Sequence, residues 1–366
     1  MHIVHVLPWL VRGGTEGQVA HLSMMLRQNG HDVTIIAGED GPWRATLLDH
    51  QIPVIVAPPY VYKGIHSRTG RISNLYATGW LAQQFRHRKP DVVSAFLYPI
   101  APLAMIAAHW ARVPVRLRNV RDLGGLRDPG PLPRWMEQVS YRCTTRFVAN
   151  SQAVADYVQH AENIPRETIE VVYNGVDVPA FPATDISESD FRREGFANPP
   201  WTTLQSRPYK DQPNEFANAN ERDRASIMIG MLANFWPNSK DHLMLVRAAR
   251  QVIDAAPHAR FVLGGRSTPY RDQVQQAIQV WQLADYVQIE TVTDPAAFLA
   301  ALDIGVLCSR TEGFSNAVLE YMAYGKPVVG TRIPAIAEAI REGETGYLVE
   351  LGDDRALAEV LLTLIR

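Results

Sequence analysis

Residues 304–330 carry the sequence IGVLCSRTEGFSNAVLEYMAYGKPVVG. The segment begins with a short continuous apolar run, Ile304–Leu307, which is typical of a buried β-strand. A glycine-containing loop follows, and a helix is predicted to begin near Ser315, whose hydroxyl suits the N-cap position. A second apolar run, Pro327–Gly330, predicts the next strand. The segment therefore predicts a strand–helix–strand unit of a parallel sheet.

The same alternation of short apolar runs and helix-length segments recurs along the chain. In the first half the predicted strands are Ile3–Leu7, Val33–Ala37, Pro53–Ala57, Asp91–Phe96, Pro114–Leu117, Arg146–Ala149 and Ile169–Tyr173. In the second half the further strands are Ile227–Leu232, Arg260–Leu263, Val287–Ile289 and Tyr347–Val349. Nearly continuous apolar strands indicate burial on both faces of a sheet. The sequence thus predicts an α/β protein with two doubly wound domains.

The domain boundaries follow from a break in this alternation. Residues 184–225 are polar, contain several prolines and show no apolar period, which predicts a linker or insertion between domains 1–183 and 226–366. The length of 366 residues agrees with two domains of ~150 residues each. With 46% hydrophobic and 20% charged residues, the composition is globular, and a formal net charge of −2 gives no global field that would attract nucleic acid.

Cysteine content and hydropathy predict the location of the protein. Two cysteines, Cys143 and Cys308, cannot form a disulfide framework, so a reducing compartment is expected. The N-terminus shows no secretory signal, and the most apolar run, Ala95–Ala111, falls short of the ~20 residues of a spanning helix. A cytoplasmic protein without membrane spans is the expectation.

Two glutamates in the first segment are candidate ligand-binding groups. Glu312 lies in the loop before the predicted helix, and Glu320 lies inside the helix. A carboxylate only accepts hydrogen bonds, so a spaced pair suits a ligand with hydroxyls at two places, such as a sugar and a ribose. Free N–H groups at the helix start form a site for phosphate between them. The alternative interpretation is a helix with two exposed acids.

This segment resembles the signature of glycosyltransferase family 4, which has two glutamates separated by seven residues. Other stretches resemble further segments of that family: Gly13–Glu16, Asn150-Ser151, Tyr173–Asp177, Lys240–His242, Leu263–Gly265 and Ala301–Ile304. The resemblance covers most of the chain outside residues 184–225. It implies the GT-B fold, in which two Rossmann-like domains face each other across a cleft and the C-terminal domain binds a nucleotide sugar.

The resemblance implies roles for residues of the C-terminal domain. Glu312 would hold hydroxyls of the donor sugar, and Glu320 would hold the ribose. Backbone amides of Phe314–Asn316 would lie near the diphosphate or the sugar. Lys240 would neutralise the departing diphosphate, where a preorganised cation contributes several kcal/mol. A solvated surface lysine is the alternative for Lys240.

Glycine loops complete the implied donor site. By resemblance, Gly13 and Gly14 would let the backbone approach the distal phosphate or sugar, and Gly265 belongs to the glycine turn after a strand of the C-terminal domain. For Gly13 and Gly14 the alternative is a plain tight turn into a helix. The resemblance also implies a retaining enzyme with no cofactor and no obligatory metal. Asp353-Asp354 is interpreted as a helix cap rather than a metal pair.

The sequence departs from the family at three places. Where the family has an arginine five or six residues before the phosphate lysine, this sequence has Phe235 and Asn234, so either Arg266 supplies the second positive charge or Asn234 donates a neutral hydrogen bond. After strand Pro114–Leu117, where the family often has a histidine near the sugar, Arg121 or Asn119 could face the donor, with a structural salt bridge as the alternative. The final helix, residues 354–365, ends the chain where the family continues, so we expect the C-terminal crossing helix to be missing.

The charge distribution suggests an acceptor side. Residues 1–183 carry 18 basic and 14 acidic residues, a net +4, and the remainder carries 18 and 24, a net −6. Basic residues cluster in a stretch without acids, residues 51–90: Lys63, Arg68, Arg71, Arg86, Arg88 and Lys89. Apolar and aromatic side chains are interleaved with them, an arrangement that can dock on an anionic membrane surface. A solvated basic face on a core-packed helix is the alternative.

The sequence therefore predicts a retaining glycosyltransferase that moves a sugar from a nucleotide sugar, UDP-linked by default, to a glycan or lipid-linked glycan. The product would belong to a surface polysaccharide or glycolipid, and the enzyme could be peripheral at the inner membrane face. Two alternatives stay open. One is a nucleotide-sugar epimerase of the same fold. The other is a nucleotide-sugar-binding subunit with weak catalysis, which the missing arginine favours.

Overall fold

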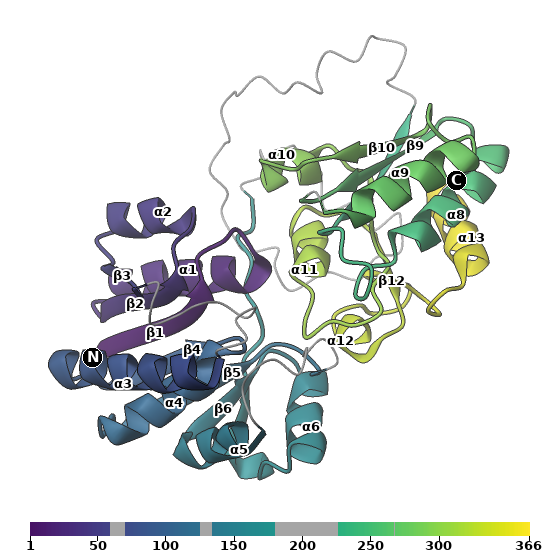
Figure 1. Ribbon diagram of the computed structural model, residues 1–366. Coiled ribbons are helices and arrows are strands. Elements are labelled where there is room, and N and C mark those ends of the chain that lie inside the picture. The colour runs from purple at the N-terminus through teal and green to yellow at the C-terminus, as the bar shows by residue number, and fades with distance from the viewer. Residues whose placement is uncertain (59–69, 125–133, 180–225, 267) are drawn as a thin grey trace, which may run out of the picture. The chain divides into compact units, whose positions relative to one another are not determined.

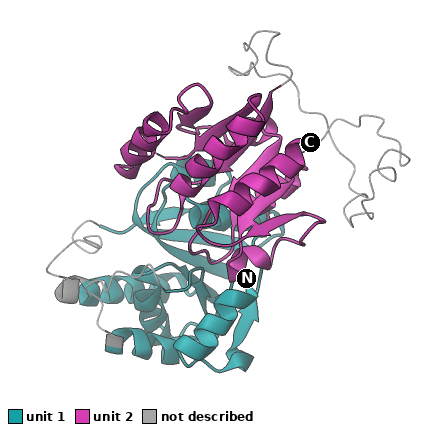
Figure 2. Ribbon diagram, turned by 90° about the vertical axis from the view of Figure 1, so that its right-hand side faces the viewer, with its two compact units in different colours: residues 1–174 teal, residues 175–366 magenta. Residues whose placement is uncertain are grey.

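The computed structural model describes residues 1–58, 70–124, 134–179, 226–266 and 268–366 (Figure 1). The chain divides into two compact units, Met1–Asn174 and Gly175–Arg366 (Figure 2). The predicted linker, residues 184–225, lies outside the described residues, so its boundaries stay a prediction. Among the described residues, no helix combines the length and the apolar character needed to cross a bilayer.

The first unit contains a seven-stranded parallel sheet with the order β3-β2-β1-β4-β5-β6-β7. Its strands are β1 His2–Trp9, β2 Asp32–Glu39, β3 Val54–Val56, β4 Val92–Phe96, β5 Val115–Val120, β6 Arg146–Ala149 and β7 Ile169–Val171. Its helices are α1 Gly14–Gln28, α2 Trp43–Asp49, α3 Gly70–Arg88, α4 Ile100–Trp110, α5 Arg134–Cys143 and α6 Gln152–Ala161. Every strand predicted in this half is present.

Alternating side chains of β1, β2 and β4 contribute to two hydrophobic cores, one on each face of the sheet. Leu7 and Ile35 pack with Val19 of α1 and Leu47 of α2 on one face. Val4, Val6 and Val93 point to the other face, where they pack with residues of α3 and α4. Burial on both faces explains why the strands read as continuous apolar runs.

The second unit contains a six-stranded parallel sheet with the order β10-β9-β8-β11-β12-β13. Its strands are β8 Ile227–Leu232, β9 Ala259–Gly264, β10 Val287–Glu290, β11 Ile304–Leu307, β12 Val328–Thr331 and β13 Gly346–Val349. Its helices are α8 His242–Ala255, α9 Tyr270–Val280, α10 Pro295–Ala300, α11 Asn316–Ala323, α12 Pro334–Ala337 and α13 Asp354–Ile365. The strand order reverses between β8 and β11, the arrangement whose carboxyl-end crevice binds ligands in doubly wound sheets.

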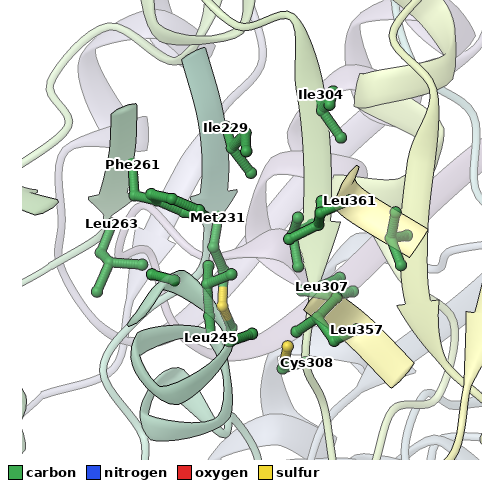
Figure 3. Packing of buried hydrophobic residues seen from close by; sticks show 14 of the residues in the cluster. Ile229, Met231, Leu245, Phe261, Leu263, Ile304, Leu307, Cys308, Leu357 and Leu361 are labelled. Carbon is green, nitrogen blue, oxygen red and sulfur yellow. The ribbon is translucent and has the colours of Figure 1, made fainter. Parts of the chain in front are cut away.

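The core of the second unit lies between β8, β9 and β11 and the helices α8 and α13. Met231 and Leu307 pack with Leu245 of α8 and with Leu357 and Leu361 of α13 (Figure 3). The strands on either side of the reversal are thus fixed from the face that α8 and α13 cover. The loops at their carboxyl ends consequently start from a rigid base.

Three details refine the sequence prediction. Strand β5 continues to Val120, so Asn119 lies inside the strand and Arg121 directly follows it. His109 is exposed although α4 is apolar, because it lies in the last turn of α4 where the helix leaves the core. Asp353 caps α13 as predicted, since its carboxylate accepts a hydrogen bond from the Ala356 backbone N–H at 2.9 Å.

Candidate active site

Lys240 and Glu312 come together at the carboxyl edge of the second sheet. The Lys240 ammonium donates to Glu312 Oε1 and, at 3.3 Å, to Ser309 Oγ. The Ser309 hydroxyl donates to the same carboxylate oxygen at 2.8 Å. The side chains of Lys240 and Glu312 are 17% and 14% exposed, so both charges are partly removed from water. The arrangement offers a cation and a hydroxyl-binding carboxylate side by side.

The backbone that carries these groups is held by β12. The Ser309 N–H donates to Thr331 Oγ1 at 3.0 Å, and the Thr331 hydroxyl donates back to the Ser309 carbonyl at 2.6 Å. Both residues are buried. The loop after β11 is therefore fixed before it reaches Glu312.

Helix α11 presents the second predicted glutamate. Ser315 is its N-cap, as predicted, and accepts a hydrogen bond from the Val318 N–H at 3.4 Å. The fully buried Tyr321 hydroxyl donates to the Val306 carbonyl at 3.3 Å and accepts from the Leu232 N–H at 2.6 Å. Helix α11 is thereby attached to both β8 and β11, which fixes the position of Glu320 relative to the sheet.

Glu320 is a half-buried carboxylate at the start of the second turn of α11. In the described part of the chain, no hydrogen bond or ion pair reaches its carboxylate oxygens. Burial raises the pKa of Glu320 above its ordinary value, because the charged form is poorly solvated. A carboxylate in this condition gains from a ligand that donates hydroxyl hydrogens to it.

Asn234, Gly265 and Arg266 meet where β8 and β9 end. The Arg266 backbone N–H donates to Asn234 Oδ1 at 3.0 Å. The NH2 of the same carboxamide therefore points away from the Arg266 backbone. A Cβ at Gly265 would overlap the carbonyl oxygen of Ala233, which explains the glycine by close approach of two backbone segments. The Arg266 side chain is exposed.

His242 links this group to Lys240. Its imidazole stacks on Phe235 at a centroid distance of 4.3 Å, and its Nε2 lies 3.3 Å from the Ala233 carbonyl oxygen. Burial lowers the pKa of His242 to about 4, so the ring is neutral at physiological pH. We therefore interpret His242 as a packing residue that supports the loops after β8.

In the first unit, the side chain of Glu16 fills the space beside the Cα atom of Gly13. Gly13 is the N-cap of α1, and a Cβ there would overlap the carboxylate of the buried Glu16. Trp9 Nε1 donates to the other oxygen of that carboxylate at 2.5 Å. The glycine thus makes room for a side chain of its own helix. Gly14 is the first residue of α1.

Arg121 lies at the end of β5 in the same region. Its guanidinium donates to the Asn174 carboxamide oxygen and lies 5.9 Å from the centroid of the Phe96 ring. Burial lowers the pKa of Arg121 to about 10, and the nearby Glu16 carboxylate opposes that shift. Arg121 therefore stays charged at neutral pH. Asn119, the other candidate, donates to Ser94 Oγ at 2.9 Å and is engaged within the sheet.

The structure adds functional candidates that the sequence prediction missed. Ser309 binds both Lys240 and Glu312, and Glu16 lies beside Gly13. Both residues lie in stretches that the sequence analysis quotes, Ser309 in residues 304–330 and Glu16 in Gly13–Glu16. Closeness in sequence to Glu312 and to Gly13 could therefore have pointed to them. Within the described ranges, no three His, Cys, Asp or Glu side chains are grouped so that they could hold a metal ion.

Family models match the two halves of the chain separately. A model described as Glycosyltransferase Family 4 matches residues 12–179, and one described as Glycosyl transferases group 1 matches residues 226–366. The glutamates and Lys240 lie in the second match, and Gly13, Gly14 and Arg121 lie in the first.

Curated and solved proteins show similarity over most of the chain. The capsular polysaccharide biosynthesis glycosyltransferase CapM of Staphylococcus aureus is 24% identical over 285 residues, 77% of this chain and 69% of CapM. An Escherichia coli protein named UDP-Gal:alpha-D-GlcNAc-diphosphoundecaprenol alpha-1,3-galactosyltransferase is 22% identical over 340 residues, 90% of this chain and 79% of that one. Several other curated relatives align over about a third of their length or less.

The fold is similar to that of a solved Anabaena protein, HepE, whose structure was determined in complex with UDP-glucose. The TM-score is 0.75 at 21% identity, and the match covers 100% of this chain and 90% of HepE. At this identity the similarity concerns the fold, which is a two-domain α/β architecture of the GT-B type.

Proposed function

The chain belongs to the glycosyltransferases of family 4 type, and on that premise we propose that it transfers a sugar from a UDP-sugar to a hydroxyl of a glycan or lipid-linked glycan, with retention of configuration. The observation that carries the proposal is the group formed by Lys240, Ser309 and Glu312, with Glu320 on the adjoining helix. A cation lies beside one hydroxyl-binding carboxylate, and a second carboxylate lies on helix α11, whose N-terminal end carries the positive end of the helix dipole.

In the proposed reaction, the bond between the anomeric carbon and the diphosphate oxygen breaks, and its electron pair leaves with UDP. The acceptor oxygen bonds to the same face of the sugar, and the acceptor proton passes to the leaving phosphate. Lys240 and the amides of Phe314–Asn316 stabilise the negative charge that develops on the diphosphate. Glu312 holds sugar hydroxyls, and Glu320 holds the ribose. We propose that no cofactor and no obligatory metal are required, with Lys240 supplying the positive charge.

A second phosphate contact is proposed for the group at the ends of β8 and β9. Asn234 uses its carboxamide oxygen for the Arg266 backbone, so its NH2 can donate to a phosphate oxygen. The exposed Arg266 side chain is the charged alternative. Arg266→Ala and Asn234→Ala separate the two. The one that supplies the contact lowers turnover strongly, and the other leaves it near the wild-type value.

The test of the proposed activity is incubation of the purified chain with UDP-glucose, UDP-galactose and UDP-N-acetylglucosamine, with and without a lipid-diphosphate-linked sugar acceptor and with EDTA in a parallel series. NMR of the anomeric protons reports the product. An α-linked product from the α-linked donor, formed also in EDTA, supports the proposal. An epimerised nucleotide sugar supports the epimerase. Tight UDP binding without turnover supports a binding subunit.

A membrane-facing role is proposed for the first unit, because some family relatives are named for lipid acceptors. Of the basic stretch predicted from sequence, Lys63, Arg68 and the side chain of Arg71 lie outside the described residues. Arg88 is half-buried and donates to Gln84 Oε1 at 2.7 Å, whereas Arg86 and Lys89 join other exposed basic residues where β4, β5 and β6 begin. This basic edge comprises Arg86, His87, Lys89, Arg112, Arg142 and Arg146.

Hydrogen bonds join the segments that carry the basic edge. Arg86 donates to the carbonyl of Trp110, whose side chain is 50% exposed, at 3.4 Å. Arg116 donates to the Val113 carbonyl at 2.6 Å and to the Cys143 carbonyl at 2.5 Å. Cations at helix C-termini also stabilise the helix dipole, so a structural role alone is the alternative.

Liposome flotation tests the membrane proposal. The protein is expected to float with vesicles containing 30% phosphatidylglycerol and to lose that binding in the double variant Arg112→Gln/Arg142→Gln. Neutral phosphatidylcholine vesicles are the matched control. Equal recovery with both vesicles, or unchanged binding of the double variant, would remove the basic edge as the docking surface.

A further inference from the structure

Two short segments form an antiparallel ladder directly behind the candidate site. Residues 239–241 precede α8, and residues 308–310 follow β11. Lys240 lies opposite Ser309 as an isolated antiparallel bridge. The Asp241 N–H donates to the Cys308 carbonyl, and the Arg310 N–H donates to the Ser239 carbonyl, both at 2.8 Å. The ladder joins the segment carrying the lysine to the segment leading to Glu312.

The ladder sends alternate side chains to opposite sides, as extended segments do. Lys240 and Ser309 point to one side, where both contact the Glu312 carboxylate. Asp241 and Arg310 form an ion pair, with Arg310 Nη2 at 2.5 Å from Asp241 Oδ2. Alternation places this pair on the side away from the lysine. The ladder therefore has the candidate site on one side and a charged pair on the other.

The two members of the pair differ in burial. The Asp241 side chain is 5% exposed, whereas the Arg310 side chain is 51% exposed. Asp241 Oδ1 also caps α8 by accepting the Met244 N–H at 3.1 Å. A buried carboxylate that loses its cation is left with an unpaired charge, so the pair differs from an ordinary surface ion pair.

We propose that Arg310 is a positioning residue for the donor: by pairing with Asp241 it holds the ladder in register, so that Lys240 stays beside Ser309 and Glu312. The inference rests on the proposed function, in which the diphosphate of the donor binds Lys240. A slip of one residue in such a ladder would turn Lys240 to the opposite side. Arg310 itself acts from the far side of the ladder and does not need to touch the donor.

A double-mutant cycle on UDP binding tests this role. Isothermal titration is carried out on the wild type, Arg310→Gln, Lys240→Gln and the combination. If Arg310 acts through Lys240, Arg310→Gln alone weakens UDP binding about tenfold relative to the wild type. The same substitution changes the affinity little when Lys240→Gln is already present. Arg310→Lys, which keeps the charge, restores most of the affinity. Arg355→Gln is the matched control, because Arg355 forms an exposed ion pair with Glu359 on α13 of the same unit.

Amide hydrogen exchange gives a readout that needs no ligand. The N–H groups of Asp241 and Arg310 donate the two ladder bonds, so Arg310→Gln is expected to speed their exchange and Arg310→Lys to leave it near the wild-type rate. Unchanged exchange, or an equal loss of affinity with and without Lys240, overturns the positioning role. A wild type that binds no UDP while the exchange result holds refutes the proposed donor and leaves the ladder intact.

Discussion

Lys240 and Glu312, 72 residues apart in the chain, form an ion pair within one unit of the protein. The proposed reaction assigns them different parts of the donor, with phosphate on the lysine and sugar hydroxyls on the glutamate. In the structure Lys240 and Glu312 bind each other. In the proposed complex, the phosphate would replace Glu312 as the partner of Lys240, and sugar hydroxyls would replace Lys240 as the partner of Glu312. The pair sets the electrostatics of the site, and its two members are expected to respond differently to substitution.

Glu312→Gln is expected to separate nucleotide binding from transfer. The substitution removes the carboxylate that neutralises Lys240, so UDP binds at least as tightly as to the wild type. Transfer falls by about 100-fold, because the contact with the sugar weakens where charge develops. Titration of UDP and steady-state kinetics with the UDP-sugar measure the two effects. Weaker UDP binding combined with normal transfer would contradict the assignment.

Glu320→Gln is expected to stabilise the folded protein and to weaken its binding of UDP. Burial raises the pKa of Glu320, so the folded state holds the proton to higher pH than the unfolded state, and stability is lost as the pH rises through the folded pKa. The variant escapes this loss, and its melting temperature should exceed the wild-type value by roughly 1–3 °C at pH 8 and by less at pH 5.

The same variant should bind UDP about tenfold more weakly, since hydrogen bonds to a charged carboxylate contribute about 1.5–3 kcal/mol. Glu359→Gln on the exposed face of α13 is the control for both measurements. A variant that is less stable than the wild type at pH 8 would contradict the burial argument.

His5→Leu is expected to reduce the acid sensitivity of the first unit. His5 is buried on β1, and neither ring nitrogen has a hydrogen-bond partner among the described residues. Burial lowers its pKa from 6.5 to about 4. The stability linked to this group is complete above pH 6.5 and is lost as the pH falls towards 4, in total on the order of 3 kcal/mol.

Urea unfolding at pH 7 and pH 5 measures this effect. The variant should lose less stability than the wild type between the two values, and at pH 7 it should be no less stable, because two unpaired buried nitrogens are removed. His160→Leu, at an exposed position on α6, should behave like the wild type. An unchanged pH dependence in His5→Leu would show that another group controls the acid response.

Alanine at the two explained glycines is expected to have unequal effects. At Gly265 the new Cβ meets the backbone oxygen of Ala233, and a rigid obstacle of that kind costs about 1–3 kcal/mol of stability. At Gly13 it meets the end of the Glu16 side chain, which can move. Thermal unfolding of Gly265→Ala and Gly13→Ala compares them. A larger loss at Gly13 would indicate that Glu16 is more firmly held than its contacts suggest.

The sequence predicted the elements of the fold because each depends on local pattern. Ile227–Leu232 and Ile304–Leu307 are strands with the predicted bounds, and α13 spans the predicted residues 354–365. The N-cap role of Ser315 was predicted for the same reason.

What the sequence could not predict depends on contacts between distant segments. The bridge between Lys240 and Ser309 is set by how the loops after β8 and β11 meet, and no local periodicity encodes that register. The ion pair between Asp241 and Arg310 depends on the same register. Glu16 lies against Gly13 because Gly13 is the N-cap of α1 and Glu16 is in the first turn of that helix. The sequence predicts the glycine turn, but it does not predict this contact.

The bridge also has a consequence for synthesis on the ribosome. The segment with Lys240 emerges long before the segment with Ser309, and Thr331, which fixes Ser309, emerges later still. The group of Lys240, Ser309 and Glu312 can therefore be fixed on a nascent chain only when β12 has been translated and has paired with β11. If the proposed function holds, UDP binds only after that step and stabilises the folded state alone.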